Sequence, residues 1–479
     1  MASWQKYVLF FAQEHVGFRG AEIKSLAHKF NIPIKYSANH NEEQPFWLVD
    51  LPDDQSARDL ASRSVSLRCI LQLWGHSDST TNIHTVVHNY VNTNFNDLKS
   101  VFEKSFRITV ETYNKHITQK EKVDRIETFG FLPLKGEVNL KDPEVNWWYI
   151  EYYGLDNNNV PEKPFDIVFG KWLVDGRRSI IKDISLKTRK FIGNTSMDPQ
   201  LSLLMANQAL AGKGDLVFDP FVGSGSLLVA AAKFGAYVMG TDIDFLMLHA
   251  KTRPSRKSQS IREKDESIRA NLRQYGCEQL YVDVLVSDFS NSIWNRNIMF
   301  DSIITDPPYG IREAIERVER KEHSKPNTIT ENDVHYPSTS HYNLSDLYEN
   351  LLHFSAKHLK LGGRLVSWIP VFKNDYCEEY LPKHKSLQLV ANSEQDISAI
   401  SSRRLLTWEK VSEPCDQPEG TNSNEIIAEF RNKFFTYGED TREERRLKQA
   451  RLRAYGKEQA MLRKSKLDSN VENSSAQSE

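Results

Sequence analysis

The residues best suited to chemistry follow a short hydrophobic segment, Phe300-Asp-Ser-Ile-Ile-Thr305, and read Asp306-Pro307-Pro308-Tyr309. Two consecutive prolines remove two backbone donors and fix two φ angles, which holds the Asp and the Tyr in a defined turn. This set suits methylation of a planar exocyclic amine, whose lone pair is delocalised into its ring. If Asp306 and the Pro307 carbonyl accept the two amine hydrogens, the nitrogen can direct its lone pair at a methyl donor. Tyr309 would stack on a base that is unpaired or flipped out, and the side-chain amide of glutamine is the alternative acceptor.

A second candidate site follows Leu216-Val-Phe-Asp219, where a turn containing Gly223 and Gly225 leads into an apolar helical segment. Glycines let the backbone approach a ligand closely, and a helix N-terminus presents free N–H groups. A pair of glycines is weak evidence by itself, because many strand–helix turns contain one. The next predicted strand strengthens it, since Tyr237–Asp242 ends in an acid where a doubly wound fold binds the ribose hydroxyls. Asp244 is the reserve candidate for this role.

The cofactor that fits these residues best is S-adenosylmethionine rather than a nicotinamide dinucleotide. Leu228 stands where a dinucleotide fingerprint has its third glycine, and the turn opens with Asp219. A carboxylate there would repel a pyrophosphate but can face a cationic, amino-acid-like ligand. A third predicted strand ends in Asp288, which could accept from the adenine amine while Phe289 packs on the ring. The predicted cofactor-binding residues of this set are Asp219, Pro220, Phe221, Gly223, Gly225, Asp242, Ile243, Asp288 and Phe289.

Alternating strands and helices from Phe191 onward must position these residues, and they predict a mostly parallel sheet covered on both faces. The expected strands are Leu216–Asp219, Tyr237–Asp242, Leu285–Asp288, Ser302–Asp306 and Arg364–Pro370. Asp198 and Pro199 are a typical helix start. Residues 1–155 read as further α/β structure, with strands expected at Tyr7–Ala12, Phe46–Leu51, Ser66–Trp74 and Phe106–Tyr113 and a helix at Ala21–Phe30. The aromatic cluster between Trp147 and Tyr153 is interpreted as core packing, with a base-stacking surface as the alternative.

Charge is informative only locally, because 62 basic and 64 acidic residues leave a formal net charge of −2. Residues 171–190 hold seven basic and two acidic residues, which suits either phosphate contact or a solvated face. The candidate RNA contacts are Lys171, Arg177, Arg178, Lys187, Arg189 and Lys190. The basic insert at 251–273 is a second candidate RNA-contacting loop, apart from a helix expected at Ile268–Tyr275. Four cysteines without a CxxC pair indicate neither a disulfide framework nor a metal site. No apolar run is long enough to span a membrane, so a cytoplasmic protein is expected.

The motifs together resemble class I S-adenosylmethionine-dependent amino-methyltransferases with a D/N-P-P-Y motif. They are most similar to the tRNA guanosine N2-methyltransferases that carry a THUMP RNA-binding domain, in particular the eukaryotic group acting on guanosine 10. The segments that carry this resemblance are Phe191-Ile-Gly-Asn-Thr-Ser-Met-Asp-Pro199, Asp219-Pro-Phe-Val-Gly-Ser-Gly225, Gly240-Thr-Asp-Ile-Asp244 and Asp306-Pro-Pro-Tyr-Gly310. Upstream, Gly136-Glu-Val-Asn-Leu-Lys-Asp-Pro143 and the Trp147/Trp148 pair look like the end of a THUMP domain.

The resemblance implies a Rossmann-like α/β methyltransferase domain with a seven-stranded, mostly parallel sheet, preceded by an α+β region with a THUMP domain. The expected division is a ferredoxin-like domain at 1–60, THUMP at 61–155, a basic linker at 156–190, the methyltransferase domain at 191–410 and a polar extension at 411–479, helical over 442–466 and disordered at its end. It also places Thr195 near the methionine end of the cofactor. The implied partners are tRNA and a small zinc-binding activator subunit shared among several methyltransferases. The alternatives are a DNA amino-methyltransferase, a protein glutamine methyltransferase and a catalytically silent tRNA-binding protein.

Overall fold

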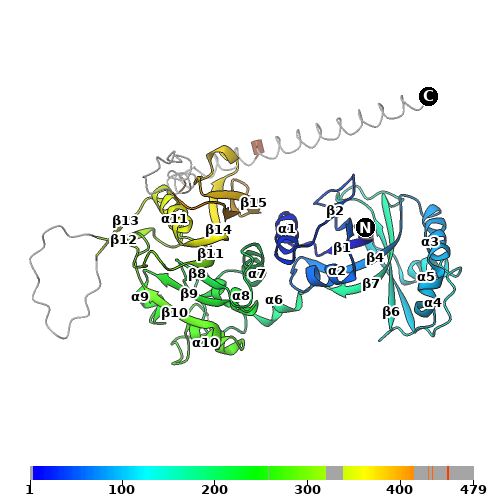
Figure 1. Ribbon diagram of the computed structural model, residues 1–479, viewed down its shortest axis with the longest axis horizontal. Helices are drawn as coiled ribbons and strands as arrows, with labels where there is room; N and C mark the ends of the chain where they lie inside the picture. The colour runs from blue at the N-terminus through cyan, green and yellow to red at the C-terminus, as the bar shows by residue number, and fades with distance from the viewer. Residues whose placement is uncertain are drawn as a thin grey trace, which may run out of the picture.

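The computed structural model describes residues 4–256, 258–319 and 338–414, together with residues 430, 434, 450 and 451. Two seven-stranded sheets with their helices form two halves joined near α6, Ser179–Asp183 (Figure 1). Within these described residues, no helix combines the length and the apolar character needed to cross a membrane. The helix and the tail expected after residue 440 lie outside the described residues, apart from positions 450 and 451.

The N-terminal sheet has the strand order β2-β3-β1-β4-β7-β6-β5. Neighbouring strands are antiparallel except β5 and β6. The strands predicted at Tyr7–Ala12, Phe46–Leu51, Ser66–Trp74 and Phe106–Tyr113 are confirmed with small shifts at their ends. The strands are β1 (Gln5–Phe11), β2 (Lys35–Tyr36), β3 (Phe46–Leu51), β4 (Leu67–Ser77), β5 (Phe106–Tyr113), β6 (Val145–Tyr152) and β7 (Asp166–Asp175).

One sheet therefore spans residues that were expected to form two domains and a linker. β1 pairs with both β3 and β4, which joins the ranges 1–60 and 61–155. The expectation of a linker over 156–190 is wrong for its middle part, because β7 lies between β4 and β6. Ile167, Val168 and Phe169 are completely buried there. The basic residues from Lys171 onward are what suggested a basic linker, whereas the apolar segment Ile167–Phe169 before them forms a buried part of the strand.

Helices cover one face of this sheet. α1 (Arg19–Phe30) and α2 (Asp54–Ala61) pack on the half nearest β1, as the core around Ile23, Leu26 and Leu60 shows. α3 (Asn82–Thr93), α4 (Phe95–Phe102) and α5 (Gln119–Glu127) lie at the other half (Figure 1). Trp147 is buried in this second core, whereas Trp148 lies against Phe10 on the opposite face, with 6.0 Å between the ring centroids. Core packing of Trp147, Tyr149, Tyr152 and Tyr153 is confirmed by their burial.

The second sheet has the order β10-β9-β8-β11-β14-β16-β15. The first five of these strands run parallel, β16 pairs antiparallel with β14, and β15 pairs antiparallel with β16. The predicted mostly parallel sheet is thus confirmed. Its strand order reverses between β8 and β11, which is where open α/β sheets bind ligands. The strands are β8 (Leu216–Asp219), β9 (Tyr237–Asp242), β10 (Tyr281–Val286), β11 (Phe300–Thr305), β14 (Leu359–Phe372), β15 (Leu387–Asp396) and β16 (Ser401–Lys410).

Two apolar cores lie on the two faces of this sheet. One contains α7 (Pro199–Gln208), α8 (Ser226–Lys233) and α10 (Ile268–Gln274), and the other contains α11 (Leu344–His358). The predicted helix start is confirmed, because the Asp198 carboxylate accepts from the backbone N–H groups of Gln200 and Leu201 at 2.8 and 3.2 Å. The remaining elements are α9 (Phe245–Leu248) and the hairpin of β12 (Glu316–Val318) and β13 (Thr339–His341).

A buried polar network joins the two halves where α1 meets α7. The Glu22 carboxylate accepts from the Ser64 hydroxyl at 2.7 Å and from the Asn207 amide at 2.8 Å. The Arg63 guanidinium donates to Asn207 Oδ1 at 3.0 and 3.1 Å and to the Ala211 carbonyl at 2.6 Å. Buried charges persist only when they are hydrogen-bonded in this way. The network therefore fixes how the N-terminal half sits on the second sheet.

Candidate active site

Asp219, the last residue of β8, is the most deeply buried acid of the predicted site, with 1% of its surface exposed. Its Oδ1 accepts from the Thr305 hydroxyl at 2.7 Å and from the Phe221 backbone N–H at 3.0 Å. Burial raises the pKa of Asp219 to about 7, against the effect of these two hydrogen bonds. Thr305 ends β11, so this contact joins the glycine turn to the strand that carries Asp306.

Asp242, at the end of β9, holds the glycine turn from the other side. Its Oδ2 accepts from the Gly223 N–H at 2.7 Å, and its Oδ1 accepts from the Asp244 N–H at 2.9 Å. Burial raises the pKa of Asp242 to about 6. Asp244 instead caps α9 through the Met247 N–H at 2.9 Å, so its carboxylate has a local structural role.

The two glycines of the turn differ in what surrounds them. Both have positive φ angles, +52° at Gly223 and +79° at Gly225. A Cβ built on Gly225 would lie 2.7 Å from Ile268 Cγ2, whereas a Cβ on Gly223 meets no atom within 4 Å. Gly225 is thus required by packing, while Gly223 opens onto free space at the start of α8. An open backbone position beside a helix N-terminus and two carboxylates fits a cationic nucleoside cofactor.

Asp306 directly follows β11 and has two side-chain partners. The Tyr309 hydroxyl donates to Asp306 Oδ1, and Arg403 Nη1 lies 3.3 Å from Asp306 Oδ2. Burial raises the pKa of Asp306, while Arg403 opposes this shift. Pro307 is buried and Tyr309 is half-buried against the core around α7 and α8. The Asp306 carboxylate lies close enough to Asp219 to raise its pKa further, so the structure brings these two predicted site residues together.

The third acid, Asp288, is placed differently from the expectation. β10 ends at Val286, two residues earlier than predicted, and Asp288 opens the following turn. Its Oδ1 accepts from the Ser290 N–H and its Oδ2 from the Val318 N–H, both at 2.8 Å. The carboxylate therefore anchors β12 to this edge of the site. An adenine contact of Asp288 stays a prediction.

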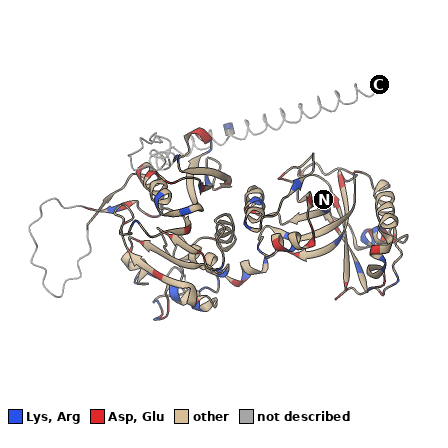
Figure 2. Ribbon diagram, viewed as in Figure 1, with Lys and Arg blue, Asp and Glu red and all other residues tan. Residues whose placement is uncertain are grey.

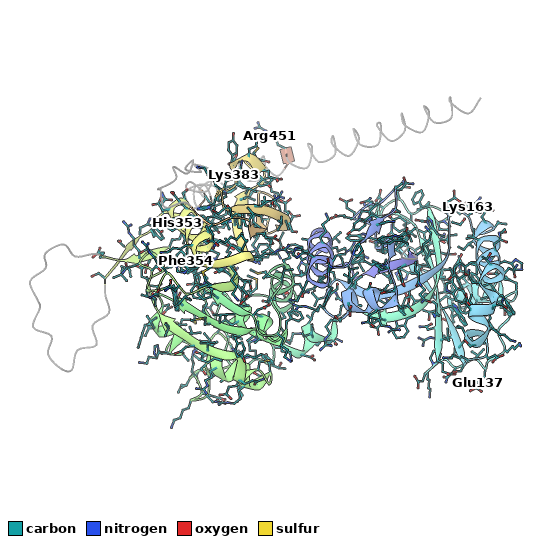
Figure 3. All side chains as sticks on the ribbon, in the orientation of Figure 1. Glu137, Lys163, His353, Phe354, Lys383 and Arg451 are labelled. Atoms are coloured by element: carbon teal, nitrogen blue, oxygen red, sulfur yellow. The ribbon has the colours of Figure 1, made fainter. Side chains whose placement is uncertain are left out.

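Phe289 packs against Phe221, which belongs to the segment leading into the glycine turn, and its contact with an adenine ring stays a prediction. Its ring centroid is 5.0 Å from that of Phe221 and 5.4 Å from that of Phe354 on α11, a residue labelled in Figure 3. Ile243 follows Asp242 and is half-buried. Phe221 stands two residues before Gly223, so the Phe221–Phe289 pair lies near the glycine turn and offers an apolar surface that suits the face of a purine ring.

The segment before α7 also reaches the glycine turn. The Ser196 and Ser224 hydroxyls lie 2.6 Å apart, and Ser224 stands between the two glycines. Thr195 is exposed and donates to Glu313 Oε1 at 3.2 Å. Glu313 also raises the pKa of Asp242. Sequence reasoning missed Glu313 because it belongs to no motif of fixed spacing.

The predicted basic residues do not form one surface. Arg189 is completely buried, and its guanidinium donates to Ser226 Oγ and to the Ile184 carbonyl, each at 2.9 Å. The expectation that Arg189 contacts RNA is therefore wrong, because it is part of the core. Arg178 donates to the Val65 carbonyl and to Glu14, each at 2.8 Å, and burial lowers the pKa of Lys171. The exposed members are Arg177, Lys187 and Lys190, the last paired with Asp265.

The insert at 251–267 is tied to the domain rather than free over its whole length. Arg256 donates to the carbonyls of Lys190, Leu186 and Arg189. Arg262 pairs with Glu266 at 2.7 Å, and both side chains are less than a tenth exposed. Lys257 lies outside the described residues. Basic and acidic side chains are interspersed over both halves (Figure 2).

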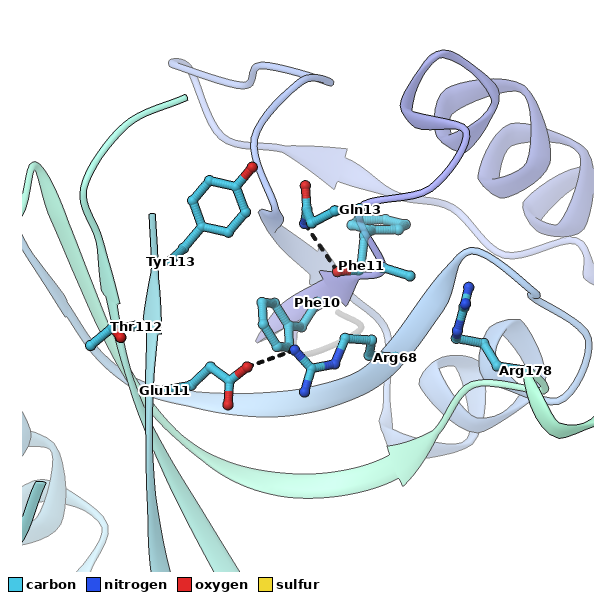
Figure 4. A pocket seen from close by; sticks show the side chains of 9 residues that line it. Phe10, Phe11, Gln13, Arg68, Glu111, Thr112, Tyr113 and Arg178 are labelled. Carbon is cyan, nitrogen blue, oxygen red and sulfur yellow. Dashed lines mark hydrogen bonds and ion pairs between the residues drawn. The ribbon is translucent and has the colours of Figure 1, made fainter. Parts of the chain in front are cut away.

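A cavity of about 310 Å³ lies in the N-terminal half, on the face opposite the helices (Figure 4). It is bounded by the end of β1 and by β5, which three strands separate in the sheet, so the sheet curls around it. Arg68 on β4 crosses the concave face to Glu111 on β5 at 2.8 Å and lies 4.6 Å above the Phe10 ring. Sequence reasoning missed this pocket because its residues come from four separate segments. The lining residues are Phe10, Phe11, Ala12, Gln13, Arg68, Glu111, Thr112, Tyr113 and Arg178.

Comparison with known proteins relates both halves to described families. Residues 5–178 match the Tmrp11 THUMP N-terminal domain, and residues 187–325 match the RMKL-like methyltransferase domain. A crystal structure of TrmN from Thermus thermophilus is similar with a TM-score of 0.41 and 16% identity, over 85% of this chain and 100% of that one.

Relatives along nearly the whole chain have the name tRNA (guanine(10)-N(2))-methyltransferase. The Homo sapiens protein is 46% identical over 90% of this chain and 95% of its own length. The Gallus gallus protein is 45% identical over 87% and 90%, and the Saccharomyces cerevisiae protein is 34% identical over 84% and 93%. At this identity and coverage, the chain belongs to the family of tRNA (guanine(10)-N(2))-methyltransferases.

Proposed function

We propose that this protein transfers a methyl group from S-adenosyl-L-methionine to the exocyclic N2 amine of guanosine 10 in tRNA, giving N2-methylguanosine. Family membership supports the reaction and the substrate. The observation that carries the proposal for this chain is the contact between Thr305 and Asp219 at 2.7 Å. It joins the end of β8, just before the glycine turn, to the end of β11, just before Asp306, where the strand order of the sheet reverses.

The cofactor would lie along the ends of β8, β9 and β10. Asp242 would accept from the ribose hydroxyls, Gly223 would let the backbone approach, and Phe221 and Phe289 would pack on the adenine. Thr195 and Asp219 would face the amino-acid end. S-adenosylmethionine supplies an electrophilic methyl group on a sulfonium. With a pKa of about 7, Asp219 can be ionised beside such a cation, because a neighbouring positive charge lowers the pKa of a carboxyl group.

The Asp306 turn would bind the target amine. An ionised Asp306 and the Pro307 carbonyl would each accept one N2–H, which directs the nitrogen lone pair along the line of transfer. Tyr309 would stack on the guanine, whose access requires that it leave the base stack. After transfer the nitrogen loses one proton, and Asp306 stands at hydrogen-bond distance to receive it or pass it to solvent.

The N-terminal half would hold the tRNA, as its match to a THUMP domain supports. Exposed Arg177, Lys187 and Lys190 lie between this half and the methyltransferase sheet and would contact phosphates. The buried network at Glu22, Arg63 and Asn207 would keep the two halves at a fixed separation while the target base enters.

A small zinc-binding activator subunit is the proposed partner, in a heterodimer. In the described part of the sheet β10 is an edge strand that pairs only with β9. Its outer backbone groups are available to a strand of another chain. Val282 and Val286 on β10 are 50% and 44% exposed, and they form the apolar surface that such a strand would cover.

The proposed location of the protein is the cytoplasm.

The test is methyl transfer from labelled S-adenosylmethionine to unmodified tRNA, followed by nucleoside analysis, with the chain alone and co-expressed with the activator. N2-methylguanosine at position 10 is expected. Asp306→Ala should abolish transfer and leave tRNA binding near the wild-type value. Asp301→Asn is the matched control, because Asp301 is an acid on the same strand that pairs with Lys360 at 2.5 Å, away from the site. Label in DNA or in a protein glutamine, with none in tRNA, would refute the proposal in favour of those alternatives.

A further inference from the structure

Arg403 reaches Asp306 from a strand that none of the family motifs includes. It lies on β16, in register with Pro370 of β14 and Gln395 of β15. Its Nη1 is 3.3 Å from Asp306 Oδ2, and the Arg403 side chain is 16% exposed. The two residues are 97 positions apart in the sequence. The antiparallel end of the sheet therefore contributes a cation to the catalytic turn.

The guanidinium of Arg403 is held by groups other than Asp306. Its central carbon lies 4.0 Å from the centroid of the Trp368 ring, which is completely buried on β14. Its Nε donates to Gln395 Oε1 at 2.8 Å, and its Nη2 lies 3.6 Å from Met197 Sδ. A planar group fixed on an aromatic face and by a side-chain amide loses little further freedom when it pairs with a carboxylate. The Arg403 guanidinium is thus held in one position independently of Asp306 and can hold the Asp306 carboxylate in turn.

Of the remaining titratable groups near Asp306, only Tyr309 among the described residues favours its ionised form. Asp219 at the end of β8 is a second acid, and Tyr348 of α11 is a neutral phenol whose pKa burial raises. The Tyr309 hydroxyl donates to Asp306 and lowers its pKa as Arg403 does, but Tyr309 belongs to the same turn and moves with it. Burial alone raises the pKa of Asp306. A protonated carboxyl group is a donor at one oxygen and cannot accept from the target amine there.

We propose that Arg403 is a positioning residue that keeps Asp306 ionised and fixes its Oδ2, so that Oδ1 is presented to the target amine. This inference rests on the proposed function. When the base enters, an amine hydrogen replaces the Tyr309 hydroxyl on Oδ1, and Tyr309 becomes free to stack. Arg403 stays on Oδ2 throughout and touches neither the base nor the cofactor.

The experiment measures kcat against pH for tRNA methylation by the full chain with its activator, in Arg403→Met and Arg403→Lys. Arg404→Met is the matched control. Arg404 is the next residue of β16 and points to the other face, where its guanidinium lies 3.8 Å from the Tyr376 ring and 2.9 Å from Glu394. Like Arg403, it lies on an aromatic ring and beside a carboxylate, but that carboxylate is not Asp306. Thermal unfolding and the KM for S-adenosylmethionine report whether each variant is folded.

In Arg403→Met, the acid limb of the kcat profile should move to higher pH by about 1–3 units, because loss of an adjacent opposite charge raises a carboxyl pKa by about that amount. On the acid side of both limbs, kcat should therefore be about 10- to 1,000-fold lower than in the wild type, and activity should return as the pH rises. Arg403→Lys should keep the acid limb of the wild type with a lower kcat, since it retains the charge but not the planar fork. The KM for S-adenosylmethionine and the profile of Arg404→Met should match the wild type.

A double-mutant cycle tests whether Arg403 acts through Asp306. In single-turnover reactions, Arg403→Met should cost nothing further in an Asp306→Asn background, because no carboxylate remains to be held. Superimposable pH profiles of wild type and Arg403→Met, or a full additive loss in the Asp306→Asn background, would overturn the proposal. Absence of N2-methylguanosine with the wild type at every pH would instead refute the proposed function itself.

Discussion

Alanine at Gly223 and alanine at Gly225 should damage the protein in two different ways, although both glycines lie in one turn and have positive φ. Left-handed backbone costs an alanine about 1–2 kcal/mol at either position. At Gly225 the new Cβ would also lie 2.7 Å from Ile268 Cγ2, and such overpacking adds about 1–3 kcal/mol. Gly225→Ala should therefore lower the free energy of unfolding by about 2–5 kcal/mol.

Gly223→Ala should lose only the backbone part of this stability, because nothing lies within 4 Å of its added Cβ. The methyl group would instead occupy the space that the cofactor needs for close approach to the turn. We expect its affinity for S-adenosylmethionine to fall by at least about tenfold, which corresponds to about 1.4 kcal/mol.

Urea unfolding of the free protein and calorimetric titration with S-adenosylmethionine measure the two effects separately. The expected pattern is a larger stability loss in Gly225→Ala and, in Gly223→Ala, an affinity loss out of proportion to its stability loss. Wild-type affinity in Gly223→Ala would refute the assignment of this turn to the cofactor. Equal stabilities of the two variants would refute the packing argument at Ile268.

Two further variants test the buried groups around the site. Burial raises the pKa of Asp219 from 3.8 to about 7. Between these two values the folded protein holds a proton on Asp219 that the unfolded chain has released. The stability that this group contributes is therefore fully present below pH 3.8 and is lost as the pH rises through about 7. Asp219→Asn removes this loss, so its stability relative to the wild type in urea unfolding should be greater at about pH 8 than at about pH 5, and a pH-independent difference would contradict the shift. Asn207→Ala leaves Glu22 and Arg63 without a shared partner in the interface between the halves and should lower the free energy of unfolding by about 3 kcal/mol. Thermal unfolding measures that loss. The control Asn350→Ala, outside the interface, should change the free energy of unfolding much less.

Local sequence patterns predicted the second sheet well because each of its inner strands is a short apolar run bounded by an acid or a turn. Leu216–Asp219 and Tyr237–Asp242 are found as predicted. β10 begins four residues earlier than predicted, at Tyr281, since its pairing with β9 rather than its apolar content sets its start. β7 was missed because its central place between β4 and β6 depends on distant strands.

The candidate site likewise has features that local sequence predicted and features that it did not. The Asp306 turn, the glycine turn and Asp242 could be found from the sequence, because their residue types fit both the local backbone geometry and the chemistry proposed for them. Arg189 shows the limit of local charge: it lies in a basic stretch of residues but is buried against Ser226.

The sequence by itself determined the motifs, the positions of the inner strands of the second sheet along the chain and the type of chemistry, because these depend on residues close together in the chain. Only the tertiary structure decided which distant residues meet. Arg403 reaches Asp306, Arg63 reaches Asn207 and Arg68 reaches Glu111. Each contact depends on how strands and helices pack across the fold, and no local pattern encodes a pairing between residues so far apart. The charge beside the Asp306 carboxylate is therefore a property of the folded sheet rather than of any motif.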